Sequence, residues 1–230
     1  MSEGLLKDSI KDRLNGGGLY LLSQMVLKTC KLQVQHLDRL EGLIVGNRPV
    51  IYTGWHGITM MAIPLIQKYH GDLRDFVVLM PDDWRGAALR IWAERMKATP
   101  HPMNLTGDST LGMARQVLRL TRRVTAGKSL YINPDGPDGP AQVIKPGIIY
   151  IARKADAVIL PIGAYARRAY IVPRWDRYAI PYPFSRIAYH IGEPIRQLPE
   201  DEDAAAKLVT DTLNAITLQA AADYYEQDTR

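Results

Sequence analysis

The sequence predicts an α/β protein with a mostly parallel central sheet flanked by helices. Short β-prone runs alternate with longer helix-like segments along most of the chain, which is typical of parallel strands joined by helical crossovers. The 230 residues are 47% hydrophobic, enough for one core of ordinary size. The sequence contains no internal repeat and no Pro/Ser-rich linker, so one domain is expected over residues 1–230.

The N-terminal segment, residues 1–48, is expected to be helical. Apolar residues recur at helical spacing from Leu19 to Leu43, after a flexible break at Gly16-Gly17-Gly18. Basic residues lie between the apolar ones, and such an amphipathic helix can lie in a membrane interface. A helix that packs on the protein's own sheet is the alternative.

Residues 49–195 form the expected catalytic core, and residues 196–230 the closing helical segment. Strands are predicted at 49–53, 76–80, 130–132, 157–164 and 189–192, and helices at 58–68, 84–97, 110–125, 148–154 and 208–225. In such folds the working site lies at the carboxyl ends of the strands. Three polar segments should therefore meet there: Gly54-Trp55-His56, Pro81-Asp82-Asp83 and Asn133-Pro134-Asp135.

Charge and composition narrow the class of protein. The net charge of +5 fits attraction to anionic lipid or to an anionic substrate such as a CoA thioester. Zinc-finger spacing and RNA-binding aromatic motifs are missing, so no nucleic-acid partner is expected. The single cysteine, Cys30, excludes an internal disulfide and is expected to be a core residue. Without a secretory signal or a spanning apolar stretch, the chain is expected to be cytoplasmic and peripheral at the inner membrane face.

Among five histidines, His56 is the best candidate for chemistry. It follows a predicted strand, and Gly54 and Gly57 would let the backbone turn and a substrate approach. An imidazole placed there could take a proton from a hydroxyl as that hydroxyl attacks a thioester carbonyl. A buried histidine bonded to a backbone carbonyl is the alternative.

The stretch Pro134 to Pro140 is the least ordinary in the chain. Two Asp-Gly turns held by three prolines predict a rigid loop with exposed backbone N–H groups. Such a loop can orient a polar headgroup or an oxyanion, and its expected substrate-binding residues are Asp135, Gly136, Pro137 and Gly139. A stiff connection without a binding role is the alternative.

The chain resembles a bacterial branch of the lysophospholipid acyltransferase superfamily from about Pro49 to Ile195. The resemblance rests on the order of these short motifs: Trp55-His56-Gly57, the Asn133 to Pro140 loop, Lys145-Pro146-Gly147, Leu160-Pro161-Ile162, Trp175-Asp176-Arg177-Tyr178, Ile180-Pro181, Pro183-Phe184-Ser185-Arg186 and Gly192-Glu193-Pro194-Ile195. It implies a glycerol-3-phosphate-acyltransferase-like fold, monotopic membrane association, and transfer of a fatty acyl group from CoA or acyl carrier protein.

The superfamily's signature, His-x-x-x-x-Asp, implies that His56 is the base, but Met61 stands where the orienting aspartate belongs. A literal copy of the signature at His70 to Asp75 is set aside, because it lies in a charged loop before a strand. The branch's Arg-Asp-Gly segment aligns here with Asp82-Asp83-Trp84-Arg85-Gly86, which puts Arg85 at the aspartate position. We therefore expect Asp83, or else Asp82, to orient His56.

Two further departures concern the acceptor. The branch's phosphate-binding Arg-Gly-Ser-Ser reads Thr106-Gly107-Asp108-Ser109 here, and Asp138 replaces the arginine of the Asp-Gly-Pro-Arg-Gly-Pro loop. An arginine holds a phosphate, whereas an aspartate repels it. These changes favour a neutral, amine-bearing or sugar acceptor, or a relocated cation such as Arg85, Lys145 or Arg115.

The expected function is acyl transfer at a membrane surface from acyl-CoA or acyl carrier protein to a lipid hydroxyl or amine, with no metal or cofactor. The expected catalytic residues are His56 and Asp83; the expected substrate-binding residues are Trp55, Asp82, Arg85, Gly107, Ser109, Asp135, Gly136, Pro137, Gly139 and Asp176, with Asp176 also expected to pair with Arg177. The rival is a non-catalytic lipid-binding or scaffold protein on the same fold. Hydrolysis, with water as the acceptor, is a third possibility.

Overall fold

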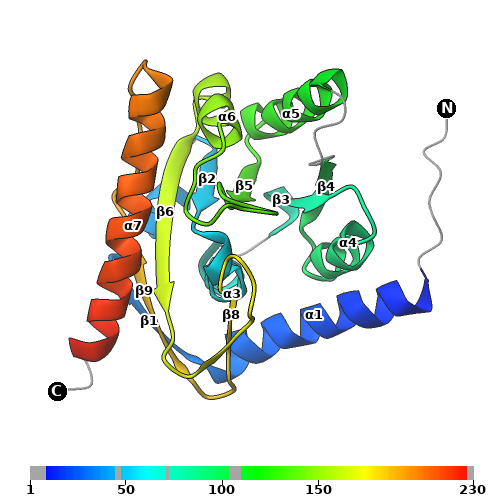
Figure 1. Ribbon diagram of the computed structural model, residues 1–230, viewed down its shortest axis with the longest axis vertical. Helices are drawn as coiled ribbons and strands as arrows, with labels where there is room; N and C mark the ends of the chain where they lie inside the picture. Colours follow the sequence, from blue (N-terminus) through cyan, green and yellow to red (C-terminus); the bar gives the residue numbers. More distant parts are fainter. Residues whose placement is uncertain (1–8, 45–47, 71–72, 104–109, 227–230) are drawn as a thin grey trace.

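A computed structural model describes residues 9–44, 48–70, 73–103 and 110–226. A seven-stranded sheet has the order β1-β9-β6-β2-β5-β3-β4 (Figure 1). Its strands are β1 Lys31–Gln35, β2 Val50–Thr53, β3 Phe76–Pro81, β4 Thr99–Met103, β5 Ser129–Ile132, β6 Val158–Tyr165 and β9 Arg186–Ile191. Neighbouring strands are parallel except β6 and β9, which are antiparallel. The predicted α/β class with a mostly parallel sheet is confirmed.

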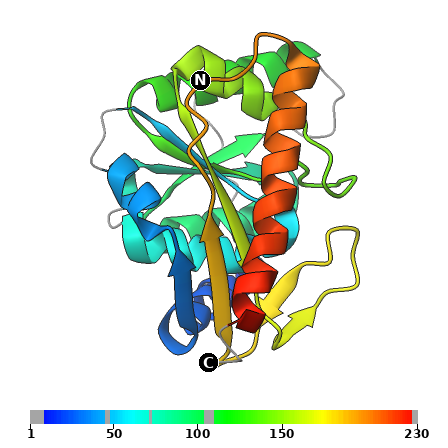
Figure 2. The ribbon, with the colours of Figure 1, turned by 90° about the vertical axis from the view of Figure 1, so that its left-hand side faces the viewer.

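Helices cover both faces of the sheet. One face carries α1 Ile10–Thr29, α2 Leu37–Ile44, α3 Thr59–His70 and α4 Gly86–Arg95; the other carries α5 Thr110–Thr125, α6 Gly147–Ala155 and α7 Glu202–Glu226. Successive strand side chains point to opposite faces, so Val50 and Tyr52 belong to one core and Ile51 to the other. Burial on both faces explains why the central strands read as continuous apolar runs. Figure 2 shows α7 lying across its face of the sheet.

The prediction of one helix from Leu19 to Leu43 is wrong, as is the break at the three glycines. The glycines lie inside α1, and a Cβ on Gly16 would come 2.6 Å from the carbonyl oxygen of Ala88. Gly16 therefore serves close packing between α1 and α4, whereas a Cβ on Gly18 would meet no atom within 4 Å. After α1, the alternating Lys31–Gln35 segment pairs with β9 as an edge strand, and His36, with φ 59°, turns the chain into α2.

Three further strands were not predicted. β4 contains Pro100 and Pro102, which are tolerated because β4 is an edge strand. β7 Ala169–Ile171 and β8 Ala179–Pro181 form an antiparallel hairpin that projects from the main sheet (Figure 2). The other predicted strands occur, although β9 and α7 begin earlier than expected. No helix among the described residues is long and apolar enough to cross a membrane.

Candidate active site

The carboxyl ends of β2, β5 and β3 lie at one edge of the sheet, as predicted. The three strands are neighbours and parallel, so the segments that follow them start side by side. Asn133, directly after β5, donates from Nδ2 to the carbonyl oxygen of Gly54, directly after β2, at 2.8 Å. Thr59 donates to Asn133 Oδ1 at 3.1 Å and so ties the start of α3 to the same edge.

His56 lies at this edge and bonds to a carboxylate from a distant segment. Its Nδ1 is 2.5 Å from Oδ2 of Asp176, which lies in the loop between β7 and β8. The Asp176 side chain is fully buried, whereas 21% of the His56 side chain is exposed. A proton on Nδ1 that is donated to Asp176 leaves a lone pair on Nε2 of the neutral ring. Within the described part of the chain, Nε2 has no hydrogen-bond partner.

Gly57 makes this contact possible. A Cβ at position 57 would lie 2.3 Å from the carbonyl oxygen of Asp176, well inside van der Waals contact. The absence of a side chain therefore lets the β7–β8 loop approach the start of the short 3-10 helix His56–Ile58. The sequence predicted that Gly57 lets another group come close, and in the structure that group is the backbone of Asp176.

Arg174 holds Asp176 from the other side. Its Nε is 3.0 Å from Oδ1 and its Nη2 is 2.5 Å from Oδ2, which is a bidentate pair. Burial alone would raise the pKa of Asp176, but the hydrogen bonds from Arg174 and His56 outweigh burial and lower this pKa. The carboxylate therefore stays ionised next to the imidazole.

Aromatic rings and a glycine fix the plane of the imidazole. The ring centroids of Trp175 and Tyr178 lie 5.4 and 5.8 Å from that of His56. A Cβ on Gly136 would come 2.8 Å from His56 Cδ2, so the proline-rich loop rests directly on the ring. A Cβ on Gly139, whose φ is +78°, would likewise come 2.8 Å from Cε3 of the Trp175 ring. The loop 134–140, the hairpin loop and His56 form one packed unit.

Asp135 has a structural task in this unit. Its buried carboxylate accepts from the backbone N–H of His56 at 3.0 Å and of Gln142 at 3.1 Å. Burial raises the pKa of Asp135, and these two N–H donors oppose the rise. The peptide bonds before Pro137 and Pro140 are cis. The two hydrogen bonds from the backbone N–H groups hold the Asp135 side chain inward, toward the backbone of His56.

The structure corrects the predicted orienting acid. Asp83 is bound by Arg85, whose Nη2 lies 2.6 Å from its Oδ2, and this hydrogen bond lowers the pKa of Asp83. Arg85 is only two residues away and captures the carboxylate locally, so the acid at His56 Nδ1 is Asp176 instead. The predicted Asp176–Arg177 pair is likewise replaced by Asp176–Arg174.

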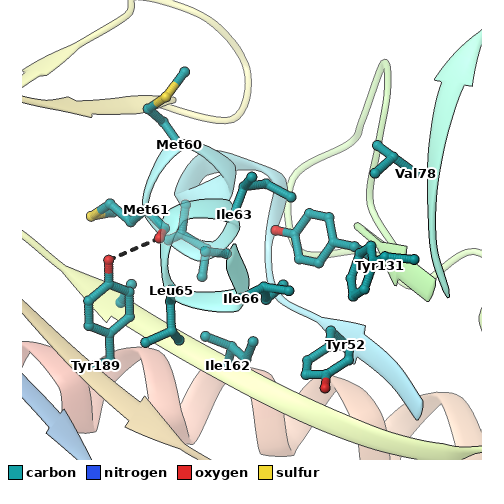
Figure 3. Close-up of a cluster of buried hydrophobic side chains, with 14 of the residues drawn as sticks. Tyr52, Met60, Met61, Ile63, Leu65, Ile66, Val78, Tyr131, Ile162 and Tyr189 are labelled. Atoms are coloured by element: carbon teal, nitrogen blue, oxygen red, sulfur yellow. Dashed lines mark hydrogen bonds between the residues drawn. The ribbon is translucent and has the colours of Figure 1, made fainter. Parts of the chain in front are cut away.

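Met61 stands where the signature that the sequence resembles has its aspartate, and it lies in the core. Its side chain is 2% exposed, and its carbonyl oxygen accepts from the hydroxyl of Tyr189 at 2.9 Å (Figure 3). In the literal copy of the signature, His70 Nδ1 contacts the Tyr52 hydroxyl at 2.9 Å, and Asp75 binds Lys128.

The remaining expected residues fall in different places. Trp55 is buried against α7, where its Nε1 donates to Asn214 at 3.1 Å, so it packs the core. Asp82 is exposed at the end of β3. Pro137 belongs to the loop beside His56, while Gly107 and Ser109 lie outside the described residues. The sequence did not single out Arg174 as a partner of Asp176, and only its place beside the Trp-Asp-Arg motif hinted at it.

Neither a metal cluster nor a second hollow offers a competing site among the described residues. No group of three or more His, Cys, Asp or Glu side chains that could hold a metal ion occurs in the described ranges. A hollow of about 730 Å³ is lined by Tyr20, Gln67, Leu73, Arg74, Arg95, Met96 and Lys97. Leu73 and Arg74 precede β3, whereas the His56 cluster follows the carboxyl ends of the strands. None of the residues that line this hollow is a histidine or a carboxylate that could act as the general base.

Comparison with known proteins agrees with this architecture. No family model matches the chain. The structure is similar to the crystal structure of the 1-acyl-sn-glycerophosphate (LPA) acyltransferase PlsC from Thermotoga maritima, with a TM-score of 0.56 and 15% sequence identity over 92% of this chain and 83% of that one. The fold is therefore that of the PlsC acyltransferase.

A sequence relative is also found. An uncharacterized protein of Rickettsia prowazekii (strain Madrid E) is 32% identical over 158 residues, which cover 69% of each chain. This identity and coverage place the chain in the same protein family as the Rickettsia prowazekii protein.

Proposed function

We propose that this protein transfers a fatty acyl group from acyl-CoA or acyl carrier protein to a lipid hydroxyl or amine, with His56 as general base and Asp176 as its orienting acid. The observation that carries the proposal is the His56–Asp176 contact of 2.5 Å at the strand ends of a PlsC-like sheet. The partly exposed imidazole can meet a substrate, while the buried carboxylate is shielded from it.

The proposed reaction is direct transfer without an acyl-enzyme. Asp176 accepts a hydrogen bond from Nδ1–H and so keeps that proton on Nδ1. Nε2 can then take the proton of the acceptor as the acceptor oxygen or nitrogen attacks the thioester carbonyl. The carbon–sulfur bond then breaks, and the thiolate leaves with the proton from His56. Such general base catalysis contributes typically about 10² to 10⁴-fold in rate.

The loop 134–140 offers donors for the oxyanion. Its three prolines have no N–H group, and the N–H of Gly136 already donates to the carbonyl oxygen of Asn133. The N–H groups of Asp138 and Gly139 are the ones we assign to the tetrahedral oxygen. The close packing of Gly139 on Trp175 holds this part of the loop beside His56.

The rival, a non-catalytic lipid-binding or scaffold protein, has two supports in the sequence: the missing aspartate at position 61 and the two lost arginines. Asp176 supplies a carboxylate to His56 from the hairpin loop, so the first of these supports loses its force. The bidentate Arg174 pair favours the enzyme further, because it keeps Asp176 ionised in a buried place.

A membrane-facing surface is part of the proposal. Ile10, Leu14 and Leu21 form an exposed apolar stripe along the outer side of α1, with the exposed basic residues Lys11 and Lys28 beside it. We call these residues the α1 stripe. The end of α1 lies close to the segment that follows β8 (Figure 1), where the backbone N–H of the exposed Phe184 donates to Thr29 Oγ1. Basic and apolar side chains together suit an anionic bilayer.

The test is acyl transfer by the purified full chain. The protein is incubated with radiolabelled palmitoyl-CoA and a mixed lipid extract, and labelled lipid is separated from free fatty acid. We expect a labelled lipid whose formation is lost in His56→Ala. His36→Asn serves as control, because His36 is exposed and asparagine tolerates its positive φ. Wild-type transfer by His56→Ala would overturn the proposal, and release of free fatty acid alone would indicate a hydrolase.

A further inference from the structure

A charged bridge spans the approach to His56. Arg85, after β3, donates from Nη1 to Oδ1 of Asp138 at 2.7 Å, and Asp138 belongs to the loop that rests on the His56 ring. The same guanidinium group is held by Asp83 through Nε and Nη2, at 3.0 and 2.6 Å from Oδ2. Arg85 is thus bound by two carboxylates at once.

The second guanidinium group near the imidazole is also bound. Arg174 Nη2 lies 3.4 Å from His56 Nδ1, but its Nε and Nη2 both donate to Asp176. Lys145 Nζ donates to the carbonyl oxygen of Gly136 at 2.8 Å. Each of these cations therefore already has an acceptor within the cluster.

Carboxylates outnumber cations in this cluster. Within the described part of the chain, the charged side chains that hydrogen bonds join to His56, to the loop 134–140 or to Arg85 comprise the cations Arg85, Arg174 and Lys145, and the acids Asp83, Asp135, Asp138 and Asp176. A phosphate monoester carries up to two negative charges near neutral pH, and bidentate arginine is the usual way to hold it. A phosphate at this site would have to compete with Asp83 and Asp138 for the guanidinium group of Arg85.

We infer that the acceptor carries no phosphate beside the hydroxyl or amine that is acylated, because Asp83 and Asp138 occupy Arg85 at the approach to His56. The acceptor class is a neutral or amine-bearing lipid such as a monoacylglycerol or a long-chain amino alcohol. Asp138 is then a specificity-determining residue. This inference rests on the proposed acyl transfer.

The first arm of the test compares acceptors. The full chain is given palmitoyl-CoA with monoacylglycerol or with lysophosphatidate of the same acyl chain, in the same neutral detergent micelles. We expect kcat/KM to be at least about tenfold higher with monoacylglycerol. Asp138→Asn should raise kcat/KM for lysophosphatidate about tenfold, which corresponds to about 1.4 kcal/mol. Asp75→Asn, whose carboxylate pairs with Lys128 outside the cluster, should leave the acceptor ratio unchanged.

The second arm is binding, which needs no turnover. sn-Glycerol 3-phosphate is titrated into each protein while tryptophan fluorescence is followed, because Trp175 packs against both Gly139 and His56. The Asp83→Asn/Asp138→Asn double variant should bind this phosphate at least about tenfold more tightly than wild type.

The outcomes separate the two proposals. A wild-type preference for lysophosphatidate overturns the acceptor inference and leaves the acyltransferase standing. If no acceptor is acylated, the proposed function fails. The titration then tests the acceptor inference by itself, and equal binding of glycerol phosphate by the wild type and the double variant contradicts that inference. Tighter binding by the double variant supports the role of the two aspartates.

Discussion

His56 Nδ1 lies 2.5 Å from Asp176 Oδ2 although 120 positions separate the two residues in the chain. The histidine follows β2 of the main sheet, and the aspartate comes from the loop of the β7–β8 hairpin. In the superfamily signature both residues would lie on one short segment, where this chain has the core residue Met61. The hairpin therefore contributes a carboxylate to the proposed site, and changes at its loop should act on the proposed acyl transfer.

Arg174→Gln should lower kcat about tenfold with little change in KM, because Arg174 fixes the Asp176 carboxylate and does not reach the acceptor in the proposed reaction. Its hydrogen bonds keep the pKa of Asp176 low, so their loss moves the acid side of the pH–rate profile to higher pH. The measurement is kcat against pH. Arg48→Gln, which breaks a surface pair with Asp156, is the control. An unchanged profile would show that Arg174 has no part in orienting Asp176.

Gly57→Ala should damage fold and activity together. The new Cβ would meet the Asp176 carbonyl oxygen at 2.3 Å, and a backbone atom cannot move away as a flexible side chain can. We expect the free energy of unfolding to fall by roughly 1–3 kcal/mol, as in other overpacked sites, and kcat to fall at least about tenfold. Urea unfolding and acyl-transfer rates measure the two effects.

The matched control for Gly57 is Gly18→Ala in α1. No atom lies within 4 Å of a Cβ at Gly18, so the substitution should raise the free energy of unfolding by up to about 1 kcal/mol through helix propensity. If Gly57→Ala were as stable and active as Gly18→Ala, the close approach of the hairpin loop would be refuted.

The α1 stripe predicts a membrane contact. Replacing both Leu14 and Leu21 by glutamate should weaken binding to phosphatidylglycerol vesicles about tenfold or more, because apolar insertion is lost and like charge is added. Vesicle co-sedimentation measures the effect. Leu218→Glu is the control, since Leu218 is equally exposed but lies on α7, on the other face. Equal losses in both proteins would mean that α1 does not face the bilayer.

His101 predicts how stability depends on pH. It is buried in β4, and burial together with the charges of Arg123 and Arg119 lowers its pKa. Below about pH 6.5 the unfolded chain takes up this proton before the folded chain does, so stability falls as the pH decreases toward the lowered pKa. His101→Gln should remove that part of the decline. The test is urea unfolding at about pH 7.5 and pH 5; parallel declines in both proteins would contradict it.

The sequence predicted what local patterns encode. Apolar runs with flanking turns located β2, β3 and β5, and their shared direction placed His56, Asn133 and Asp135 at one edge. Those features depend on residues close together in the chain, and their burial follows from their composition. The ordered motifs implied a glycerol-3-phosphate-acyltransferase-like fold, and the structure is similar to that of the PlsC acyltransferase.

What the sequence could not provide depends on contacts between distant segments. Asp83 was expected to orient His56 because it is near in the chain, but Arg85, nearer still, binds it. Asp176 reaches His56 only when the hairpin folds back against the main sheet. The need for a glycine at position 57 is visible only when the carbonyl oxygen of Asp176 is known to lie beside it. The glycines of α1 looked like a break for the same reason, since Gly16 packs against Ala88 on another helix.

The most direct measurement of the central claim is kcat for acyl transfer by Asp176→Asn. Asparagine keeps the shape of the side chain but removes the charge that holds the Nδ1 proton, and the corresponding change in a serine protease triad costs about 10⁴-fold. We predict a loss of at least about 100-fold in kcat with KM nearly unchanged. Asp223→Asn, which alters the separate His190–Asp223 pair between β9 and α7, should keep the wild-type rate. Wild-type turnover by Asp176→Asn, or an equal loss in Asp223→Asn, would contradict the His56–Asp176 dyad.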